Sequence, residues 1–376
     1  MDPISLTSTS RLSRLRSSAR LPSNCVAGEP WTELKEKIVI NGVKVLDVHA
    51  HVSHPMEGMG RMFMFMQGAN MNFDSPIGTP TADQFGLGDE AFTVAVQQHI
   101  DYIDERNIDA QILGPRPFLL MGWMEPHLLP GWTRLVNDAI HHQVAMHPKR
   151  FVGACQLPQN AHAPDSTHML DELRRTVNEY SFAGVYVSPD PDGHRNSPGL
   201  ADRYWYPLFE ECCERSLPII VHGSNSLDRR YAHVPHNYQL GFVAEQYWAG
   251  QILSHSRVFD DFPELRVIIC HCGGALDRWI PTDPHLAQRD LRDNLFYDTC
   301  AHDLHFLEAA IKQRGVERMC FGSEAPGSGR SVRPETGRTA DDLVPVIDAF
   351  EFLSDTDKRQ ILHDNPARLF PRFLEL

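Results

Sequence analysis

The chain has 376 residues, a formal net charge of −14 and 20 histidines, and its pI is about 5.8. The acidic balance argues against nucleic acid as a partner, because phosphate binding needs a basic face. No run of about 18 apolar residues occurs, so we expect no membrane-spanning segment. The eight scattered cysteines predict reduced, buried thiols in a cytoplasmic protein rather than a disulfide framework.

The N-terminal region differs in composition from the rest of the chain. Residues 8–23 are rich in arginine and serine and contain no acidic residue. This composition also resembles a transit peptide, whereas no apolar core of a secretory signal follows it. We interpret residues 1–37 as an N-terminal arm that is flexible or wraps around a partner, and residues 38–376 as one domain.

Short apolar runs then alternate with amphipathic stretches along the chain. Continuous apolar runs are typical of parallel strands that are buried on both faces. The eight runs are 43–52, 110–114, 151–157, 184–188, 218–222, 266–272, 295–299 and 319–322. Helices are expected between them, for example over 167–179, 206–215 and 304–314. This alternation predicts an α/β fold, a (β/α)₈ TIM-like barrel. A doubly wound sheet is the competing fold, but no Gly-x-Gly-x-x-Gly follows any of the runs.

A long segment, residues 54–90, separates the first two expected strands. Six of the 12 methionines fall between positions 56 and 71. Methionine is flexible and fills irregular apolar surfaces. The segment is therefore expected to be a lid over the mouth of the barrel, a contact with another subunit, or both.

Ionisable residues gather where the expected strands end, which is the face that carries the active site in such barrels. In His49-Ala-His51 the two imidazoles lie on the same side of a strand, because alternate residues do. Asp47, one step earlier on that side, is expected to orient the pair or to join it. Three histidines and a carboxylate would suit a divalent metal ion. The full set at this face is His49, His51, Arg116, His222, His271, Asp298 and Glu324.

Simpler interpretations exist for several of these residues taken alone. His222 is compatible with a core histidine bonded to the backbone, and Asp298 with a helix cap or a structural carboxylate. His271 opens a His-Cys-Gly-Gly turn that needs glycine conformations. His302 and His305, three residues apart in an expected helix, are interpreted as surface residues or as residues just behind the site.

Five segments resemble the amidohydrolase superfamily, in particular its aminocarboxymuconate-semialdehyde decarboxylase-like group. Their order, strand placement and identity all agree, and together they cover roughly residues 44–372. Within the group the similarity is greatest to oxalomesaconate hydratases, and decarboxylases of the group usually carry Asp at the position of Glu324. This closer similarity rests on Ser188-Pro-Asp-Pro-Asp-Gly-His194, Asp202-Arg-Tyr-Trp-Tyr-Pro207, Phe296-Tyr-Asp-Thr-Cys300 and Ser323-Glu324. The segments are Asp47-Val-His49-Ala-His51, Val221-His222-Gly-Ser, His271-Cys-Gly-Gly-Ala275, Phe321-Gly-Ser-Glu324 and Asn365-Pro-Ala-Arg-Leu-Phe.

The resemblance implies a role for each matching residue in a barrel of the amidohydrolase type. His271 is expected to position or protonate the substrate or a water, with Asp298 and His271 itself as possible further metal ligands. Arg116 is expected to pair with a substrate carboxylate, with help from Arg61 or Arg229. The implied ion is Zn²⁺ or Mn²⁺, with an Fe/Mn pair as the alternative. The implied metal ligands are His49, His51, His222 and Glu324.

Three functional hypotheses follow from this set of residues. The first is a metal-dependent lyase, a hydratase or a decarboxylase, acting on a small unsaturated carboxylic acid. The second is an O₂-dependent hydroxylase with two metals, the second held by residues such as Asp298, His271, His302 or Glu245. The third is a non-catalytic partner subunit. A homo-oligomer, or a hetero-oligomer with a related subunit, is expected in each case.

Overall fold

The computed structural model describes residues 42–53, 90–234, 239–285, 289–334 and 336–376. The predicted arm, the methionine-rich segment up to residue 89 and Arg61 lie outside this part of the chain. Eight parallel strands pair in chain order, which confirms the predicted barrel. They are β1 (Leu46–His51), β2 (Ala110–Gly114), β3 (Phe151–Gln156), β4 (Gly184–Val187), β5 (Ile219–Val221), β6 (Val267–Ile269), β7 (Leu295–Asp298) and β8 (Met319–Cys320).

Backbone hydrogen bonds join the last strand to the first. The Val48 amide donates to the Phe321 carbonyl, and the Glu324 amide donates to the His49 carbonyl, each over 2.9 Å. These bonds close the sheet into a barrel at the mouth, where β1 meets the segment that follows β8.

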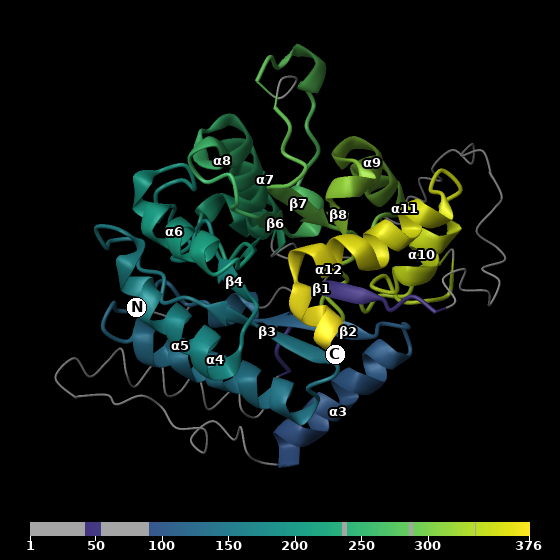
Figure 1. Cartoon of the computed structure of the whole chain (residues 1–376), viewed down its shortest axis with the longest axis horizontal. Coiled ribbons are helices and arrows are strands. Elements are labelled where there is room, and N and C mark those ends of the chain that lie inside the picture. The colour runs from purple at the N-terminus through teal and green to yellow at the C-terminus, as the bar shows by residue number, and fades with distance from the viewer. Residues whose placement is uncertain (1–41, 54–89, 235–238, 286–288, 335) are drawn as a thin grey trace, which may run out of the picture.

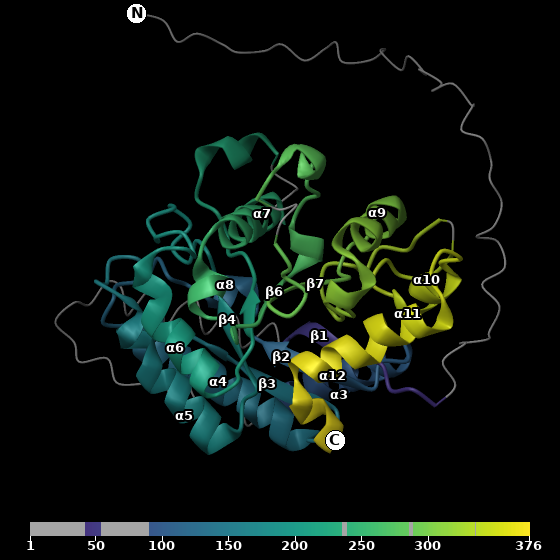
Figure 2. The ribbon, with the colours of Figure 1, turned by 45° about the horizontal axis from the view of Figure 1, so that its top comes forward.

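Helices surround the strands, and Figure 2 shows α4, α5 and α6 on one side of the barrel and α10, α11 and α12 on the other. The helix predicted at 304–314 is found as α9, and α6 ends one residue before the predicted end. The helix predicted from 167 begins with a 3₁₀ turn, Ser166–Met169. None of the described helices is long and apolar enough to cross a bilayer. The helices are α3 (Glu90–Asp104), α4 (Leu129–Met146), α5 (Leu170–Tyr180), α6 (Tyr206–Glu214), α7 (Gln239–His255), α8 (Val258–Asp261), α9 (Leu304–Arg314), α10 (Val344–Ala349), α11 (Asp355–Arg359) and α12 (Asn365–Leu369).

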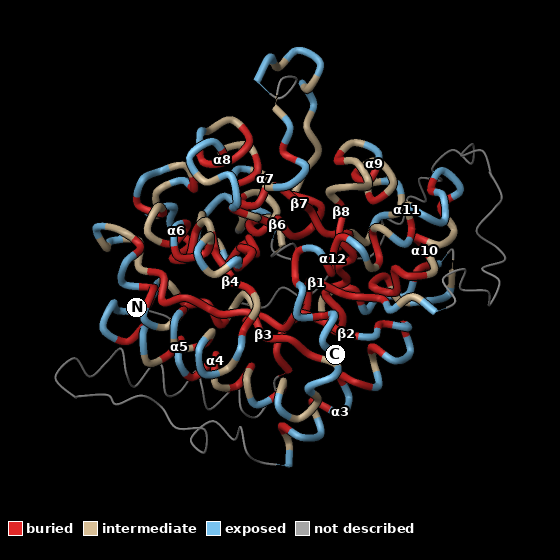
Figure 3. Tube along the Cα trace, in the orientation of Figure 1, coloured by how far each residue is buried: buried red, intermediate tan, exposed pale blue. Residues whose placement is uncertain are grey.

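Two apolar clusters form the core, one inside the barrel and one between the strands and the helices. On β5, Ile220 belongs to the inner cluster, whereas Ile219 and Val221 belong to the outer one. Alternation therefore turns the next residue, His222, toward the inside of the barrel. Figure 3 shows the strands buried at the centre, with exposed residues on the outer turns of the helices.

The C-terminal segment closes the end of the barrel opposite the mouth. Leu369, Phe370 and Phe373 pack in the inner cluster with Leu46 and Phe296. Figure 1 shows α12 lying across the strands next to the C-terminus. Because apolar side chains fill this end, the polar residues at the ends of the strands face the opposite opening.

A buried hydrogen-bond network links helix α3 to β1. His99 Nε2 donates to Gln111 Oε1 over 2.8 Å, and the Ser53 hydroxyl donates to His99 Nδ1 over 2.8 Å. Gln111 Nε2 then donates to Asp47 Oδ2 over 2.8 Å. Burial lowers the pKa of His99 to about 3, so this imidazole is neutral in the native protein.

Acidification is expected to destabilise the native protein through His99. Unfolded His99 binds a proton below its ordinary pKa of about 6.5, whereas the native residue stays neutral, so this contribution to stability is complete above that pKa and is lost as the pH falls. From pH 7 to pH 5 the free energy of unfolding should fall by about 2 kcal/mol through this residue. Urea unfolding of wild type and His99→Gln at both pH values measures it. An equal pH dependence in the two proteins would contradict the assignment.

Candidate metal centre

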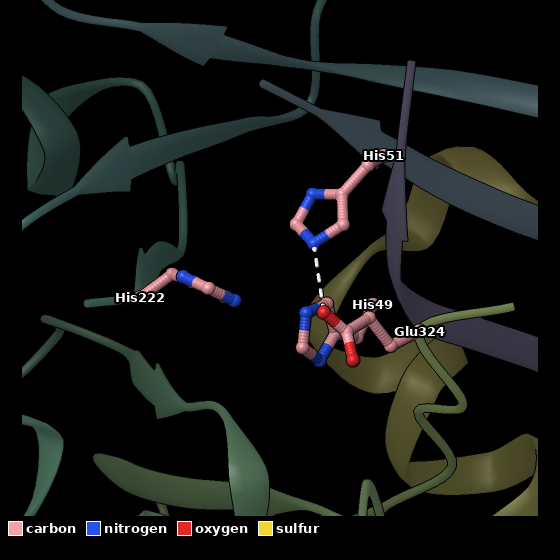
Figure 4. A group of neighbouring side chains, drawn as sticks. All are labelled: His49, His51, His222 and Glu324. Carbon is pink, nitrogen blue, oxygen red and sulfur yellow. Dashed lines mark ion pairs between the residues drawn. The ribbon is translucent and has the colours of Figure 1, made fainter. Parts of the chain in front are cut away.

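Four buried side chains converge at the mouth of the barrel, as the sequence predicts. One ligand atom from each of His49, His51, His222 and Glu324 lies within 4.8 Å of the others. His49 and His51 come from β1, His222 directly follows β5, and Glu324 follows β8 by four residues. Figure 4 shows His222 pointing from β5 toward the other three. Such a group could hold one metal ion, whose bonds to these atoms would be about 2.0–2.2 Å long.

Each of the three imidazoles is held through Nδ1. The acceptors are Asp298 Oδ2 for His49 at 2.7 Å, the Pro115 carbonyl for His51 at 2.9 Å and the Gly223 carbonyl for His222 at 2.7 Å. Because these oxygens only accept, Nδ1 carries the proton of the neutral ring, and Nε2 of that ring keeps a lone pair. All three Nε2 atoms are buried without a hydrogen-bond partner among the described residues. Buried orphan lone pairs aimed at one point fit a metal ion.

The charges of the cluster also suit a cation. Burial lowers the pKa of His51 to about 4 and that of His222 well below its ordinary value, so both rings are neutral. Burial would raise the pKa of Glu324, but the nearby imidazoles of His271 and His51 hold it well below the usual range. Burial likewise opposes the charging of His49, yet Cys270 and the hydrogen bond to Asp298 raise its pKa. The carboxylate of Glu324 is therefore ionised beside the lone pairs of the neutral His51 and His222 rings.

Asp47 lies behind the cluster and connects β1 to the segment that follows β8. Its Oδ1 accepts from the His49 amide over 2.9 Å and from the Ser323 amide over 3.1 Å. Its Oδ2 accepts from the Ser323 hydroxyl over 2.5 Å. Burial raises the pKa of Asp47 to about 6. Asp47 was predicted either to orient the histidine pair or to bind the metal with it. These contacts match orientation, because Asp47 connects β1, which carries both histidines, to the segment before Glu324.

Gly322 allows that segment to approach β1 and β7. A Cβ atom at this position would lie 2.8 Å from Asp298 Cβ and 3.0 Å from His49 Cβ. Both distances are too short for ordinary packing, so any side chain here would displace His49 and the carboxylate that orients it. The glycine of Phe321-Gly-Ser-Glu324 is thus required by close approach.

Asp298 and His271, both predicted as possible further ligands, have distinct surroundings. Asp298 holds His49 with Oδ2, and its Oδ1 accepts from the backbone amides of Cys272 and Cys300, each over 3.0 Å. These contacts support a role in orientation. His271 has φ of +52°, its Nδ1 lies about 3 Å from the Gln246 amide group, and its Nε2 lies 3.8 Å from Glu324 Oε2.

A cavity of about 510 Å³ opens onto His51 and Glu324, and Arg116 forms part of its lining. Arg116 Nε donates to the Val52 carbonyl over 3.0 Å, which fixes the guanidinium group at the mouth. Arg229 is exposed on the 3₁₀ turn Arg229–His233, which also brings Tyr231 to the cavity. The volume suits a small organic ligand.

His302 and His305 lie just behind the site and on the surface, respectively, as expected from the sequence. His305 is exposed, whereas His302 is half-buried and its Nε2 lies 3.1 Å from the Ser328 hydroxyl, which bonds to Glu324. Glu245, considered for a second metal, instead pairs with Arg195 over 2.8 Å. It belongs to none of the close ligand groups among the described residues.

Two supporting residues were missed by the sequence analysis. Gln246 lies on α7 and holds His271, and Ser328 lies on the loop after β8 and donates to Glu324 over 2.5 Å. Neither stands in a segment with a recognisable pattern, because each acts from an element that only the fold brings to the mouth. Seven cysteines lie in the described part, and all are free thiols, as predicted.

Comparison with known proteins agrees with this geometry. The sequence model of the amidohydrolase family matches residues 46–372. The chain belongs to the amidohydrolase family. It is 35% identical to a 2-keto-4-carboxy-3-hexenedioate hydratase of Sphingobium sp. over 72% of this chain and 80% of the relative. It is 23% identical to a 2-amino-3-carboxymuconate-6-semialdehyde decarboxylase of Dictyostelium discoideum over 89% and 86% of the two chains.

Solved structures show the same barrel. A 4-oxalomesaconate hydratase of Rhodopseudomonas palustris superposes with a TM-score of 0.73 at 25% identity, over 88% of this chain and 97% of that one. A dihydroxybenzoic acid decarboxylase of Polaromonas sp., solved with bound manganese, superposes with a TM-score of 0.62 at 20% identity over 88% and 97%. The predicted superfamily, its decarboxylase-like group and the similarity to hydratases are confirmed. These relatives are lyases, so they lend no support to the hydroxylase hypothesis.

Proposed function

We propose that this protein is a metal-dependent lyase that acts on a small unsaturated carboxylic acid. The observation that carries the proposal is the convergence of three orphan Nε2 atoms and one ionised carboxylate at a cavity that contains an arginine. Hydration of a carbon–carbon double bond is the favoured reaction, and decarboxylation is the alternative. An intact set of ligands also argues against a non-catalytic partner subunit.

The ion would be held by His49, His51, His222 and Glu324. Neutral imidazoles and one carboxylate suit Zn²⁺ or Mn²⁺, and manganese is present in the solved decarboxylase of Polaromonas sp.. When bound, such an ion lowers the pKa of a water and polarises a carbonyl or carboxylate of the substrate. Asp298 and the two backbone carbonyls would keep each ring in the tautomer that binds.

The residues around the ion would bind the substrate and move protons. Arg116 would pair with a substrate carboxylate in a bidentate contact and offset the repulsion that a net charge of −14 imposes on an anion. The contribution of Arg229 and Arg61 to binding the substrate carboxylate stays a prediction. His271, fixed by Gln246 with its Nε2 facing the cluster, would transfer the proton at the reacting carbon or oxygen.

Two features favour hydration over decarboxylation. The 35% identical relative from Sphingobium sp. is a hydratase, and so is the solved structure that matches at a TM-score of 0.73. Glu324 stands where the resemblance implies Asp for decarboxylases.

Proposals can also be made for the cellular location, the catalytic domain and the assembly of the protein. We infer a cytoplasmic location from the seven described free thiols, since a reducing compartment keeps cysteines unpaired. Residues 38–376 are proposed as the catalytic domain. Assembly with further copies of the chain or with a related subunit stays a prediction, with the N-terminal arm and the segment at 54–90 as proposed contacts.

The proposal is tested by turnover on a panel of small unsaturated mono-, di- and tricarboxylic acids. Protein stripped by a chelator is compared with protein reloaded with Mn²⁺ or Zn²⁺. We expect metal-dependent loss of the conjugated double bond without release of CO₂. Release of CO₂ would support the decarboxylase alternative, and turnover that persists in full after removal of the metal would contradict the proposal.

Arg116→Lys is expected to raise KM for the substrate sharply, because an ammonium group cannot reproduce the two-pronged contact of guanidinium. Loss of one such charge-assisted contact corresponds to about 10-fold or more in KM. Steady-state kinetics on the best acid of the panel measures the change. Arg134→Lys, at an exposed position of α4, serves as the matched control. Unchanged kcat/KM in both Arg116→Lys and Arg116→Ala would make the arginine structural.

A further inference from the structure

A second group of metal-binding side chains adjoins the proposed centre. Cys300 and His302 follow β7, and one ligand atom from each lies within 4.8 Å of the other and of a Glu324 oxygen. Cys300 is 2% exposed, and its Sγ lies 4.0 Å from Glu324 Oε2. No role was expected for Cys300, His302 was expected only as a candidate ligand in the hydroxylase hypothesis, and the proposed lyase reaction requires neither residue.

The carboxylate of Glu324 faces both groups, one with each oxygen. Its Oε1 lies 3.5 Å from His51 Nε2, which belongs to the proposed centre and is joined to Glu324 by the dashed line in Figure 4. Its Oε2 lies on the side of Cys300 and 3.8 Å from His271 Nε2. A carboxylate oriented in this way is able to bridge two ions, one on each oxygen.

Hydrogen bonds define which nitrogen of His302 is available. The Ser328 hydroxyl donates its proton to Glu324 Oε2, so it accepts from His302 Nε2. His302 Nδ1 therefore keeps a lone pair, and this atom is buried without a hydrogen-bond partner among the described residues. His271 Nε2 is orphaned in the same way. Leaving a buried polar atom unpaired is unfavourable, and a ligand would offset this cost.

We propose that Cys300, His302 and Glu324 Oε2 form a second metal site, with His271 beside it. A thiolate and an imidazole with one carboxylate oxygen select a thiophilic divalent ion such as Zn²⁺, Fe²⁺ or Co²⁺. The site shares His302 and the neighbouring His271 with the one considered from the sequence, but it uses Cys300 and Glu324 instead of Asp298 or Glu245. The oxygens of Asp298 are engaged by His49 and two backbone amides, and Glu245 pairs with Arg195.

Cobalt titration of the full-length, metal-stripped protein tests the second site. We expect two Co²⁺ per chain, and the second equivalent should produce the near-ultraviolet charge-transfer band of a thiolate bound to cobalt. Cys300→Ser should bind one Co²⁺ and lack the band. His302→Ala should weaken the second ion at least 10-fold while it retains the first. Cys320→Ser is the matched control, because that buried thiol packs in the inner cluster below the mouth.

The titration distinguishes failure of the second metal site from failure of the proposed lyase centre. One Co²⁺ per chain without the thiolate band overturns the second site and leaves the proposed function standing. A band that survives in Cys300→Ser but disappears in Cys270→Ser places the thiolate beside Asp298 and also overturns it. Unchanged affinity for the second ion in His302→Ala contradicts it as well. Absence of any bound Co²⁺ would overturn both the second site and the proposed lyase centre.

Discussion

Replacing His222 by alanine is expected to strip the protein of its metal and of its activity. His222 supplies one of the three buried Nε2 lone pairs, and its ring is fixed by the Gly223 carbonyl at 2.7 Å. Loss of a residue that merely supports a metal ligand costs about 10–100-fold in affinity, so loss of the ligand itself should exceed about 100-fold. Metal content after dialysis and kcat on the panel substrate measure both effects.

His305→Ala provides the control for His222→Ala. It removes an exposed imidazole of α9 that lies outside the close ligand groups among the described residues. This variant should keep wild-type metal content and kcat. Full metal content in His222→Ala, with a normal circular dichroism spectrum, would show that the centre lies elsewhere.

The second large effect is expected for His271→Asn, in which kcat should fall by about 10²–10⁴-fold while the metal of the proposed centre stays bound. His271 does not belong to the group of four that would hold this ion, and its Nε2 faces the cluster at 3.8 Å from Glu324 Oε2. Asparagine keeps a polar group against Gln246 but cannot transfer a proton near neutral pH. Rapid-quench or steady-state rates, with metal content measured on the same samples, separate the two roles.

The Gln246→Leu variant tests whether the position of the His271 ring matters for the reaction. Gln246 touches His271 Nδ1 from α7 and is fully buried, so its loss should free the imidazole without removing it. We expect a smaller fall in kcat than for His271→Asn, together with a shifted pH profile. If His271→Asn loses the metal and regains the full rate when metal is added back, His271 is a ligand rather than the proton donor.

Much of the barrel follows from the pattern of apolar residues. Continuous runs separated by amphipathic helices define parallel strands, and alternation explains why His222 follows the inward-facing Ile220. The pair His49 and His51 shares one side for the same reason. A register shift in β1 between Asp47 and Ala50 changes which residues of that strand face inward. The pattern of apolar residues in the sequence did not predict this shift.

The rest of the site depends on backbone conformations that alternation does not describe. His271 falls on the same side of β6 as the outward-facing Ile269, and a left-handed φ of +52° accompanies its turn toward the cluster. Glu324, four residues past β8, has φ of +57°. Non-glycine residues seldom adopt such angles, and they concentrate where function requires them. Only the resemblance to the family pointed to these two residues with a role attached.

The position of a bound ion would show directly which residues form the metal centre. Crystals of the full-length protein soaked with Mn²⁺ would reveal it by anomalous scattering. We expect a peak about 2.0–2.6 Å from the Nε2 atoms of His49, His51 and His222 and from a Glu324 oxygen. A Mn²⁺ peak at another position, or none at this one under saturating Mn²⁺, would show that these four residues do not hold the catalytic metal.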